Sequence, residues 1–218
     1  MQEKIQNFLS AHGAGKVGFC KLEGQTPFGL SYAVSYTIPL SDAIIDSITD
    51  APTHTYFHHY RTVNTLIDRL SLQVGLMLAQ NGYRYAPVPA SQSISGFEGL
   101  FSHKQAAVLS GLGSIGKSNL FLSDQYGPRV RLGTVLTDCA FDVQPVHPSC
   151  LCGSCSLCVK ACPAMAITGT AWRPGIARAE MFDAQACSSY MKRSFQQIGR
   201  GAVCGICMRV CPKGQNKK

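Results

Sequence analysis

The sequence predicts an α+β protein in which a mixed sheet with helices is followed by a small cysteine-rich module. The 218 residues are enough for one domain of moderate size and a second, smaller one. Hydrophobic residues make up 45% of the chain and charged residues 15%, a composition that excludes an intrinsically disordered protein. Because ten of the eleven cysteines fall between Cys139 and Cys211, the second part is expected to bind metal.

Four segments have the composition of β-strands. Residues 17–20 and 32–38 are rich in β-branched and aromatic residues and are bounded by glycine and proline. Residues 83–88 and 130–136 share these properties. We expect these four strands to form the sheet of the first domain.

Two helices are expected between these strands. Ser41 and Asp42 begin a short helix that extends to Ile48. A long helix runs from about Pro52 or Tyr56 to Gln80, where Asn81 and Gly82 end it. Its apolar residues recur at three- and four-residue spacing, which predicts that one face packs on a core. These residues are Val63, Leu66, Ile67, Leu70, Val74, Met77 and Leu78.

The composition changes near residue 145, so we expect domains at residues 1–145 and 146–218. Residues 1–145 carry ten basic and ten acidic side chains, whereas residues 146–218 carry ten basic side chains against Glu180 and Asp183. The net charge of +8 therefore belongs to the second part. Such a basic region could bind nucleic acid or an acidic redox partner. Alternatively, it compensates for anionic clusters and ends in a solvated tail at Lys217 and Lys218.

No targeting or membrane signal is expected in this sequence. The first residues show no apolar run behind a basic patch, and nowhere do about 18 apolar residues follow one another. We therefore expect a cytoplasmic protein. The histidines His54, His58 and His59 include a pair four residues apart that could hold a metal, but no third ligand is evident.

A glycine-rich stretch at residues 111–118 fits both the dinucleotide and the phosphate-loop patterns. Both patterns require a strand before the loop and a long helix after it. Here Ser102 and Gln105 predict a helix that ends at Gly111, and the following segment is too short for a nucleotide-binding helix. We expect a turn that packs against another ligand, formed by Gly111, Gly113, Ser114, Ile115, Gly116 and Lys117. An ATPase, with Asp138 at magnesium, is the less favoured alternative.

The cysteines from Cys152 to Cys162 form the strongest motif in the chain. Cys152, Cys155 and Cys158 are followed by Cys162 and a proline, which is the bacterial ferredoxin run for a [4Fe–4S] cluster. In proteins with two such clusters the fourth cysteine of a run binds the other cluster. Structural zinc also uses four cysteines, but it requires neither a third cysteine at this spacing nor the Cys-Pro ending.

The second run, Cys204, Cys207 and Cys211 before a proline, lacks its first member because Gly201 stands there. Cys187 is the favoured substitute, and Cys150 is its competitor. With exchange of the fourth ligands, the first cube takes Cys152, Cys155, Cys158 and Cys211. The second cube takes Cys162, Cys187, Cys204 and Cys207, which leaves Cys20, Cys139 and Cys150 without a metal.

With these motifs the chain resembles the epoxyqueuosine reductase family, cobalamin and iron–sulfur enzymes akin to reductive dehalogenases. The resemblance covers residues 100–212 well and the N-terminal third weakly. It is carried by residues 111–117, 133–138, 152–163, 187–190 and 204–212.

The resemblance implies a nitroreductase-like first domain that holds cobalamin beside the nearer cube, with the glycine loop in the cofactor chamber. It also implies the ligand sorting given above. Two departures matter. Residues 88–92 contain no carboxylate where the family has an aspartate general acid, and the chain stops at Lys218, without the helical repeats that help full-length members grip tRNA.

The sequence thus predicts an oxidoreductase that delivers low-potential electrons to a bound corrinoid or its substrate. The expected partners are a donor of the ferredoxin or flavodoxin type and a small-molecule or corrinoid ligand, with tRNA less favoured and no membrane. A non-catalytic electron carrier or maturation partner is the alternative from another class. Reduction of epoxyqueuosine itself is not expected, because opening an epoxide needs a proton donor.

Overall fold

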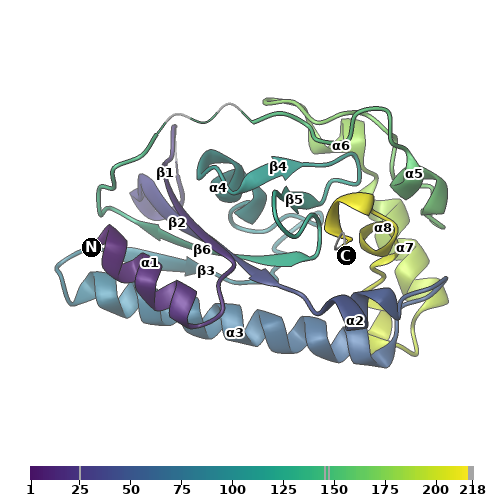
Figure 1. Cartoon of the computed structure of the whole chain (residues 1–218), viewed down its shortest axis with the longest axis horizontal. Helices are drawn as coiled ribbons and strands as arrows, with labels where there is room; N and C mark the ends of the chain where they lie inside the picture. Colours follow the sequence, from purple (N-terminus) through teal and green to yellow (C-terminus); the bar gives the residue numbers. More distant parts are fainter. Residues whose placement is uncertain (25, 145, 147, 216–218) are drawn as a thin grey trace. The chain divides into compact units, whose positions relative to one another are not determined.

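The computed structural model describes residues 1–24, 26–144, 146 and 148–215, and they form two compact units (Figure 1). Unit 1 consists of Met1–Pro39, Val63–Gly113 and Arg131–His147. Unit 2 consists of Leu40–Thr62, Ser114–Val130 and Pro148–Lys218. The expected tail residues Lys217 and Lys218 lie outside the described part of the chain.

The sheet has the order β1-β2-β6-β3, and each of its strands was expected from the sequence. The strands are β1 (Lys16–Lys21), β2 (Tyr32–Pro39), β3 (Tyr85–Val88) and β6 (Val130–Thr137). β1 pairs with β2 and β3 pairs with β6, both antiparallel. The expectation of an α+β fold with a sheet and helices is thereby confirmed.

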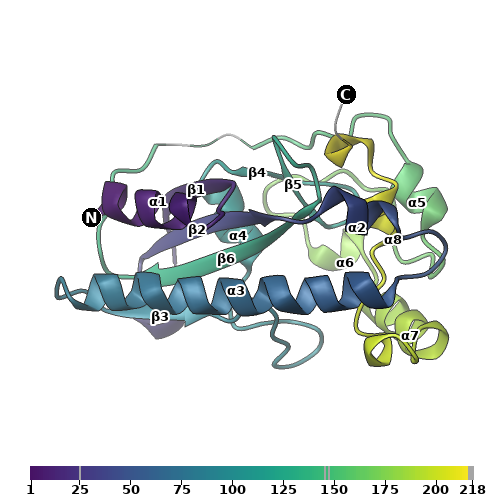
Figure 2. The same ribbon diagram turned by 60° about the horizontal axis from the view of Figure 1, so that its bottom comes forward.

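Helices α3 (His54–Ala79) and α4 (His103–Leu109) cover opposite faces of the sheet. Tyr36 on β2 donates a hydrogen bond of 2.8 Å from its hydroxyl to the Ile67 carbonyl of α3. On β1, the Cys20 thiol points instead to the Ala106 carbonyl of α4. Cys20 lies opposite Ala33 in the pairing of β1 with β2, and Ala33 is three residues from Tyr36 along β2. Because successive side chains of a strand point to opposite faces, the contacts of Cys20 and Tyr36 lie on different faces of the sheet. Figure 2 shows α3 running along the sheet as the longest helix, and helix α1 (Gln2–Ala11) packs on β1.

The face of α3 predicted from periodicity is the one that packs. Of the seven apolar residues expected there, five are at most 6% exposed, and Leu66 and Met77 are half-buried. Tyr36, which packs on this helix, is completely buried, and its hydroxyl also shares a hydrogen bond of 2.8 Å with Ser71. The long helix is therefore fixed by apolar burial and by a satisfied buried hydroxyl.

Unit 2 is built from much shorter elements. Its helices are α2 (Asp42–Asp46), α5 (Leu157–Ala161), α6 (Arg178–Met181), α7 (Ala184–Ser194) and α8 (Ile206–Arg209). Strand β5 (Phe121–Ser123) pairs with β4 (Gly113–Ile115), and single 3-10 turns lie at Gly199–Gly201 and Pro212–Gly214. In unit 1 a further 3-10 turn spans Pro27–Gly29.

The units differ from the expected division at residue 145, because two N-terminal stretches pack on the cysteine-rich region. Arg129 is buried and donates hydrogen bonds of 2.7 Å to both Asp42 and Asp46. Asp46 also lies 3.5 Å from the Arg209 guanidinium on α8. These ion pairs join segments far apart in sequence, which composition alone could not indicate.

Within the described residues, no helix combines the length and hydrophobicity needed to span a bilayer.

Candidate iron–sulfur centre

The structure brings four of the predicted cluster cysteines together in unit 2: Cys152, Cys155, Cys158 and Cys211. Burial raises the pKa of the Cys152 thiol to about 11, the Lys117 backbone N–H opposes the shift, and the Cys150 and Cys211 thiols add to it. Burial also raises the pKa of Cys158, with further contributions from Cys211 and Cys155. These mutual effects arise only between near neighbours, so Cys211 lies with the first run although it is distant in sequence.

A second group contains Cys162, Cys187, Cys204 and Cys207. Burial raises the pKa of Cys187 to about 11, and its neighbours Cys204 and Cys162 raise it further. Burial raises the pKa of Cys207 above its ordinary range, with contributions from Cys204, Cys187 and Cys162. Cys162 therefore lies with the second run, although its motif belongs to the first.

Helix α7 explains why the second run lacks its first cysteine. Gly201, which stands at that position, has a φ of +67°, and a Cβ there would lie 2.5 Å from the Met191 carbonyl of α7. No side chain fits at this place without moving the helix. The same helix carries Cys187, and Asp183 caps it by accepting a hydrogen bond of 2.8 Å from the Ala186 N–H. α7 thus fills the space of the missing ligand and supplies another cysteine.

The chemistry of these two groups fits iron–sulfur cubes. Burial and mutual repulsion both disfavour thiolates, so eight clustered thiols can ionise together only around bound cations. A cube requires its four sulfurs to stand around an inorganic core, wider apart than around a single ion. Among the described residues, no three His, Cys, Asp or Glu side chains converge as a preformed site for one metal ion.

Cys150, the competing ligand, lies beside Cys152 and not beside the second group. Cys20 and Cys139 are buried thiols at 2% and 1% exposure, as expected for cysteines without a metal. Of the three histidines named from the sequence, His59 has a structural role, because its Nε2 accepts a hydrogen bond of 3.1 Å from the Ser41 N–H.

The glycine loop contacts the first cluster motif. The Lys117 N–H donates to Cys152 Sγ at 3.4 Å. Its Nζ donates to the Gly153 carbonyl at 2.8 Å and to the Cys155 carbonyl at 3.1 Å. A Cβ at Gly116 would lie 2.8 Å from Leu122 and 3.4 Å from Cys152 Sγ, so this glycine allows close approach. Sequence reasoning had placed Lys117 toward a bound cofactor and missed these contacts.

The elements around the loop argue against nucleotide binding. As predicted, helix α4 precedes it, and Ser102 caps this helix by accepting from the Gln105 N–H at 3.4 Å. Strand β4 lies within the loop itself, and the chain behind it continues into β5, so the loop is followed by a strand and not by a helix. A phosphate loop would need the reverse order of strand and helix, and its lysine would be free for phosphate. The ATPase alternative is therefore not supported.

Unit 1 places a polar cluster around residues 89 and 90, in the segment where the sequence lacks the expected acid. The Ala90 N–H donates to Asp68 at 2.8 Å, and Arg131 donates to the Ala90 carbonyl at 2.8 Å. His103 contacts the Pro89 carbonyl through Nε2 at 2.9 Å and Thr134 through Nδ1 at 2.8 Å. These side chains hold the backbone of the segment by hydrogen bonds.

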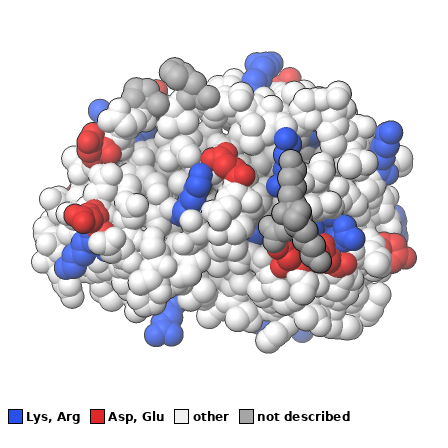
Figure 3. All heavy atoms as spheres, in the orientation of Figure 1, with Lys and Arg blue, Asp and Glu red and all other residues white. Residues whose placement is uncertain are grey.

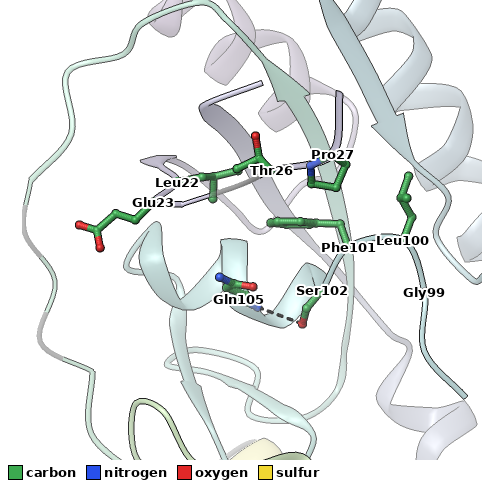
Figure 4. A pocket seen from close by; sticks show the side chains of 9 residues that line it. All are labelled: Leu22, Glu23, Thr26, Pro27, Gly99, Leu100, Phe101, Ser102 and Gln105. Atoms are coloured by element: carbon green, nitrogen blue, oxygen red, sulfur yellow. Dashed lines mark hydrogen bonds between the residues drawn. The ribbon is translucent and has the colours of Figure 1, made fainter. Parts of the chain in front are cut away.

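A pocket of about 530 Å³ opens in unit 1 (Figure 4). Figure 4 shows the Phe101 ring and the Leu22 side chain in its wall, with Ser102 and Gln105 as polar groups. Its volume suits a small molecule. None of the cluster cysteines or glycine-loop residues lines it.

The basic excess of the chain does not form a broad patch on the face drawn in Figure 3. Blue and red side chains stand there singly or in small mixed groups among uncharged residues. This face gives no support to an extended surface for nucleic acid.

Comparison with known proteins agrees with the cysteine pattern. Residues 151–214 match the family model described as a 4Fe-4S double cluster binding domain, a range that includes all eight assigned cysteines. The chain carries two [4Fe–4S] clusters.

Related proteins are found among reductases. The chain is 34% identical over 122 residues to an epoxyqueuosine reductase of Lactococcus garvieae, a match that covers 50% of this chain and 32% of that protein. A tetrachloroethene reductive dehalogenase of Desulfitobacterium hafniense is 31% identical over 104 residues, covering 45% and 17% of the two chains. This chain is similar to both kinds of reductase. It spans about a third or less of the length of these relatives.

Solved structures share the fold. The catabolic reductive dehalogenase NpRdhA gives a TM-score of 0.79 at 19% identity, with 98% of this chain and 32% of that chain covered. A selenomethionine-labelled epoxyqueuosine reductase gives 0.65 at 19% identity, with 99% and 66% covered. At this identity the likeness establishes the fold alone.

Proposed function

We propose that this protein is an iron–sulfur oxidoreductase that passes single electrons through two cubes to a corrinoid. Cys152, Cys155, Cys158 and Cys211 hold the first cube, and Cys162, Cys187, Cys204 and Cys207 hold the second. The observation that carries the proposal is the exchange of fourth ligands between the two cysteine runs. That exchange supports a two-cluster relay, because each run then holds parts of both cubes.

The two ligand groups adjoin one another at Cys158 and Cys207. Cys158 contributes to the raised pKa of Cys207, although the two residues belong to different cubes in our assignment. Cys158 and Cys162 are also joined through helix α5, which begins at Leu157. A short separation between cubes supports transfer of one electron at a time from an external donor to the acceptor.

We propose a corrinoid as that acceptor, with the glycine loop as part of its site. One structural neighbour is a reductive dehalogenase whose structure suggests a mechanism for B12-dependent dehalogenation. When bound, a corrinoid would supply a strongly reducing cobalt centre. Gly111 has a φ of +69°, which favours glycine, and Gly113, Ser114 and Ile115 follow it as strand β4. Gly116 and Lys117 would instead support the first cube.

The substrate proposed from the resemblance needs a proton donor that this chain lacks at the expected place. Residues 88–92 contain no carboxylate. The polar side chains around residues 89 and 90 are engaged in hydrogen bonds with backbone and side-chain atoms, and burial lowers the pKa of His103, which keeps that ring neutral. We therefore propose that the protein reduces a bound corrinoid but does not convert epoxyqueuosine in tRNA to queuosine.

We propose a low-potential ferredoxin or flavodoxin as the electron donor, and a nitroreductase-like fold for unit 1. One structural neighbour was solved with an epoxyqueuosine-modified tRNA stem loop, so tRNA is the partner to test first. A non-catalytic electron carrier is not favoured, since the named relatives are reductases.

Corrinoid reduction can be tested in anaerobic protein by adding hydroxocobalamin and a limiting low-potential reductant. We expect the Co(I) spectrum to form at a rate that rises with protein concentration. In Gly113→Val this rate should fall sharply, while the iron content should stay unchanged. Equal rates with and without protein would remove the corrinoid from the proposal. Turnover of epoxyqueuosine-modified tRNA would contradict the proposed lack of that activity.

A further inference from the structure

We propose that Lys117 is a positioning residue that fixes the ligand loop of the first cube and raises the reduction potential of this cube. The inference rests on the proposed assignment of Cys152 and Cys155 to that cube and does not depend on a corrinoid. It departs from the sequence pattern, in which this lysine resembles a phosphate-binding residue.

Three hydrogen bonds from one residue carry the inference. The Lys117 N–H points to the sulfur of Cys152, and the Nζ group bridges the carbonyls of Gly153 and Cys155. Cys152 and Cys155 are joined by a further bond of 3.0 Å from the Cys155 N–H to the Cys152 carbonyl. The lysine therefore holds the turn between two ligands from both ends.

The backbone around Lys117 makes this position specific. Gly116 approaches so closely that a Cβ would contact both Leu122 and Cys152 Sγ. Ser114 and Ile115 before it are 3% and 8% exposed, so the strand cannot shift outward without uncovering buried residues. Lys117 itself remains half-buried.

The electrostatic consequence follows from the charge of the cube. A cube held by four thiolates is net anionic, and one-electron reduction adds a further negative charge without making or breaking a covalent bond. An ammonium group beside the ligand loop and an N–H aimed at a ligand sulfur both stabilise the reduced form more than the oxidised form. Lys117 should thus make the first cube easier to reduce.

The second cube has no matching lysine in the contacts that the structure describes. Cys162 Sγ accepts a bond of 3.4 Å from the Ala166 N–H, which resembles the backbone bond to Cys152. The positive group among the influences on Cys187 is Arg178, which lowers the pKa of that thiol as a minor contribution. Removal of Lys117 should therefore act on one cube and leave the other unchanged.

The test is an anaerobic redox titration followed by electron paramagnetic resonance in Lys117→Gln, Lys117→Met and Lys117→Arg. Gln and Met should each lower the midpoint potential of the first cube and leave the other midpoint unchanged. The expected shift is about 59 mV, which for one electron is about a tenfold change in the ratio of oxidised to reduced cube. Arg, which keeps the charge, should stay near the parent value. Lys4→Met, on helix α1 of unit 1, serves as the control for loss of a positive charge elsewhere.

Iron content separates the possible failures. With about eight iron per chain and both midpoints unchanged in Lys117→Gln, the inference fails while the two-cluster assignment stands. A parent protein with about four iron, or with zinc, would overturn the assignment itself. If Lys117→Met loses iron, Lys117→Gln keeps donors for the carbonyls and still reports the potential. A shift in Lys117→Met with none in Lys117→Gln would overturn the role of the charge.

Discussion

Unit 1 and unit 2 are stabilised in different ways. Unit 1 contains the eight-residue strand β2, all of β6 except its first residue and most of the 26-residue helix α3, and a set of fully buried apolar side chains fills its interior. The longest helix that lies wholly in the described part of unit 2 is α7, with 11 residues, and α6 and α8 have four each. Helices this short are marginal without tertiary support. The contrast indicates that burial determines unit 1, whereas bound clusters determine much of unit 2.

The largest expected effect is that of removing the iron. Chelation under reducing conditions should abolish amide protection in residues 150–215, because ligand binding and folding are coupled when a site is built from short elements. The sheet strands β1 and β2 should retain most of theirs. Hydrogen exchange read by mass spectrometry measures both units in one sample. Equal loss of protection in both would show that unit 1 also depends on the clusters.

Replacing Cys187 should break the second group alone. Cys187→Ala is expected to halve the iron per chain, since Gly201 leaves no room for a substitute, and to leave the signal of one cube. Cys150→Ala is the matched control and should keep the full iron content. If the two variants behave in the opposite way, Cys150 is the eighth ligand.

A core change in unit 1 should leave the clusters untouched. Tyr36→Phe removes a hydroxyl that donates to the Ile67 carbonyl and bonds to Ser71, and should lower the free energy of unfolding of unit 1 by about 1–2 kcal/mol. Ser71→Ala should cost less, because the Ile67 carbonyl still accepts the Tyr36 hydroxyl. Iron content should be unchanged in both variants. A loss of iron in Tyr36→Phe would contradict the independence of the two units.

The smallest expected effect is the pH dependence that His103 contributes to unit 1. Burial lowers the pKa of His103 below its ordinary value of 6.5, so the folded protein binds a proton less readily than the unfolded chain. The contribution of His103 to the free energy of unfolding is complete above pH 6.5. It is lost as the pH falls below this value, at no more than about 1.4 kcal/mol per pH unit. Hydrogen exchange of β3 and β6 at pH 7.5 and pH 5.5 should show this loss. In His103→Gln the difference between the two pH values should shrink, and an unchanged difference would exclude His103 as its source.

The sequence allowed the large elements of unit 1 to be predicted because apolar periodicity is a local signal. Helix α1 escaped notice, since only Ile5 and Leu9 of its ten residues are buried apolar side chains. The β4–β5 hairpin was missed because its strands have three residues each, too few to show alternation.

The candidate site was predictable only where the spacing of its cysteines along the sequence indicates the metal that they bind. Ferredoxin-like runs identify the cluster cysteines, whereas the contacts of Lys117 depend on a hairpin brought to the ligand loop by tertiary packing. The same holds for Arg129, whose partners Asp42 and Asp46 lie more than 80 positions away. Neither residue carries a local signal of its role.

The central claim is that two complete sets of four cysteines hold two cubes, and metal analysis of anaerobically purified protein tests it most directly. The account predicts about eight iron and eight acid-labile sulfide per chain, with no stoichiometric zinc. About four iron per chain, or zinc in place of iron, would contradict it.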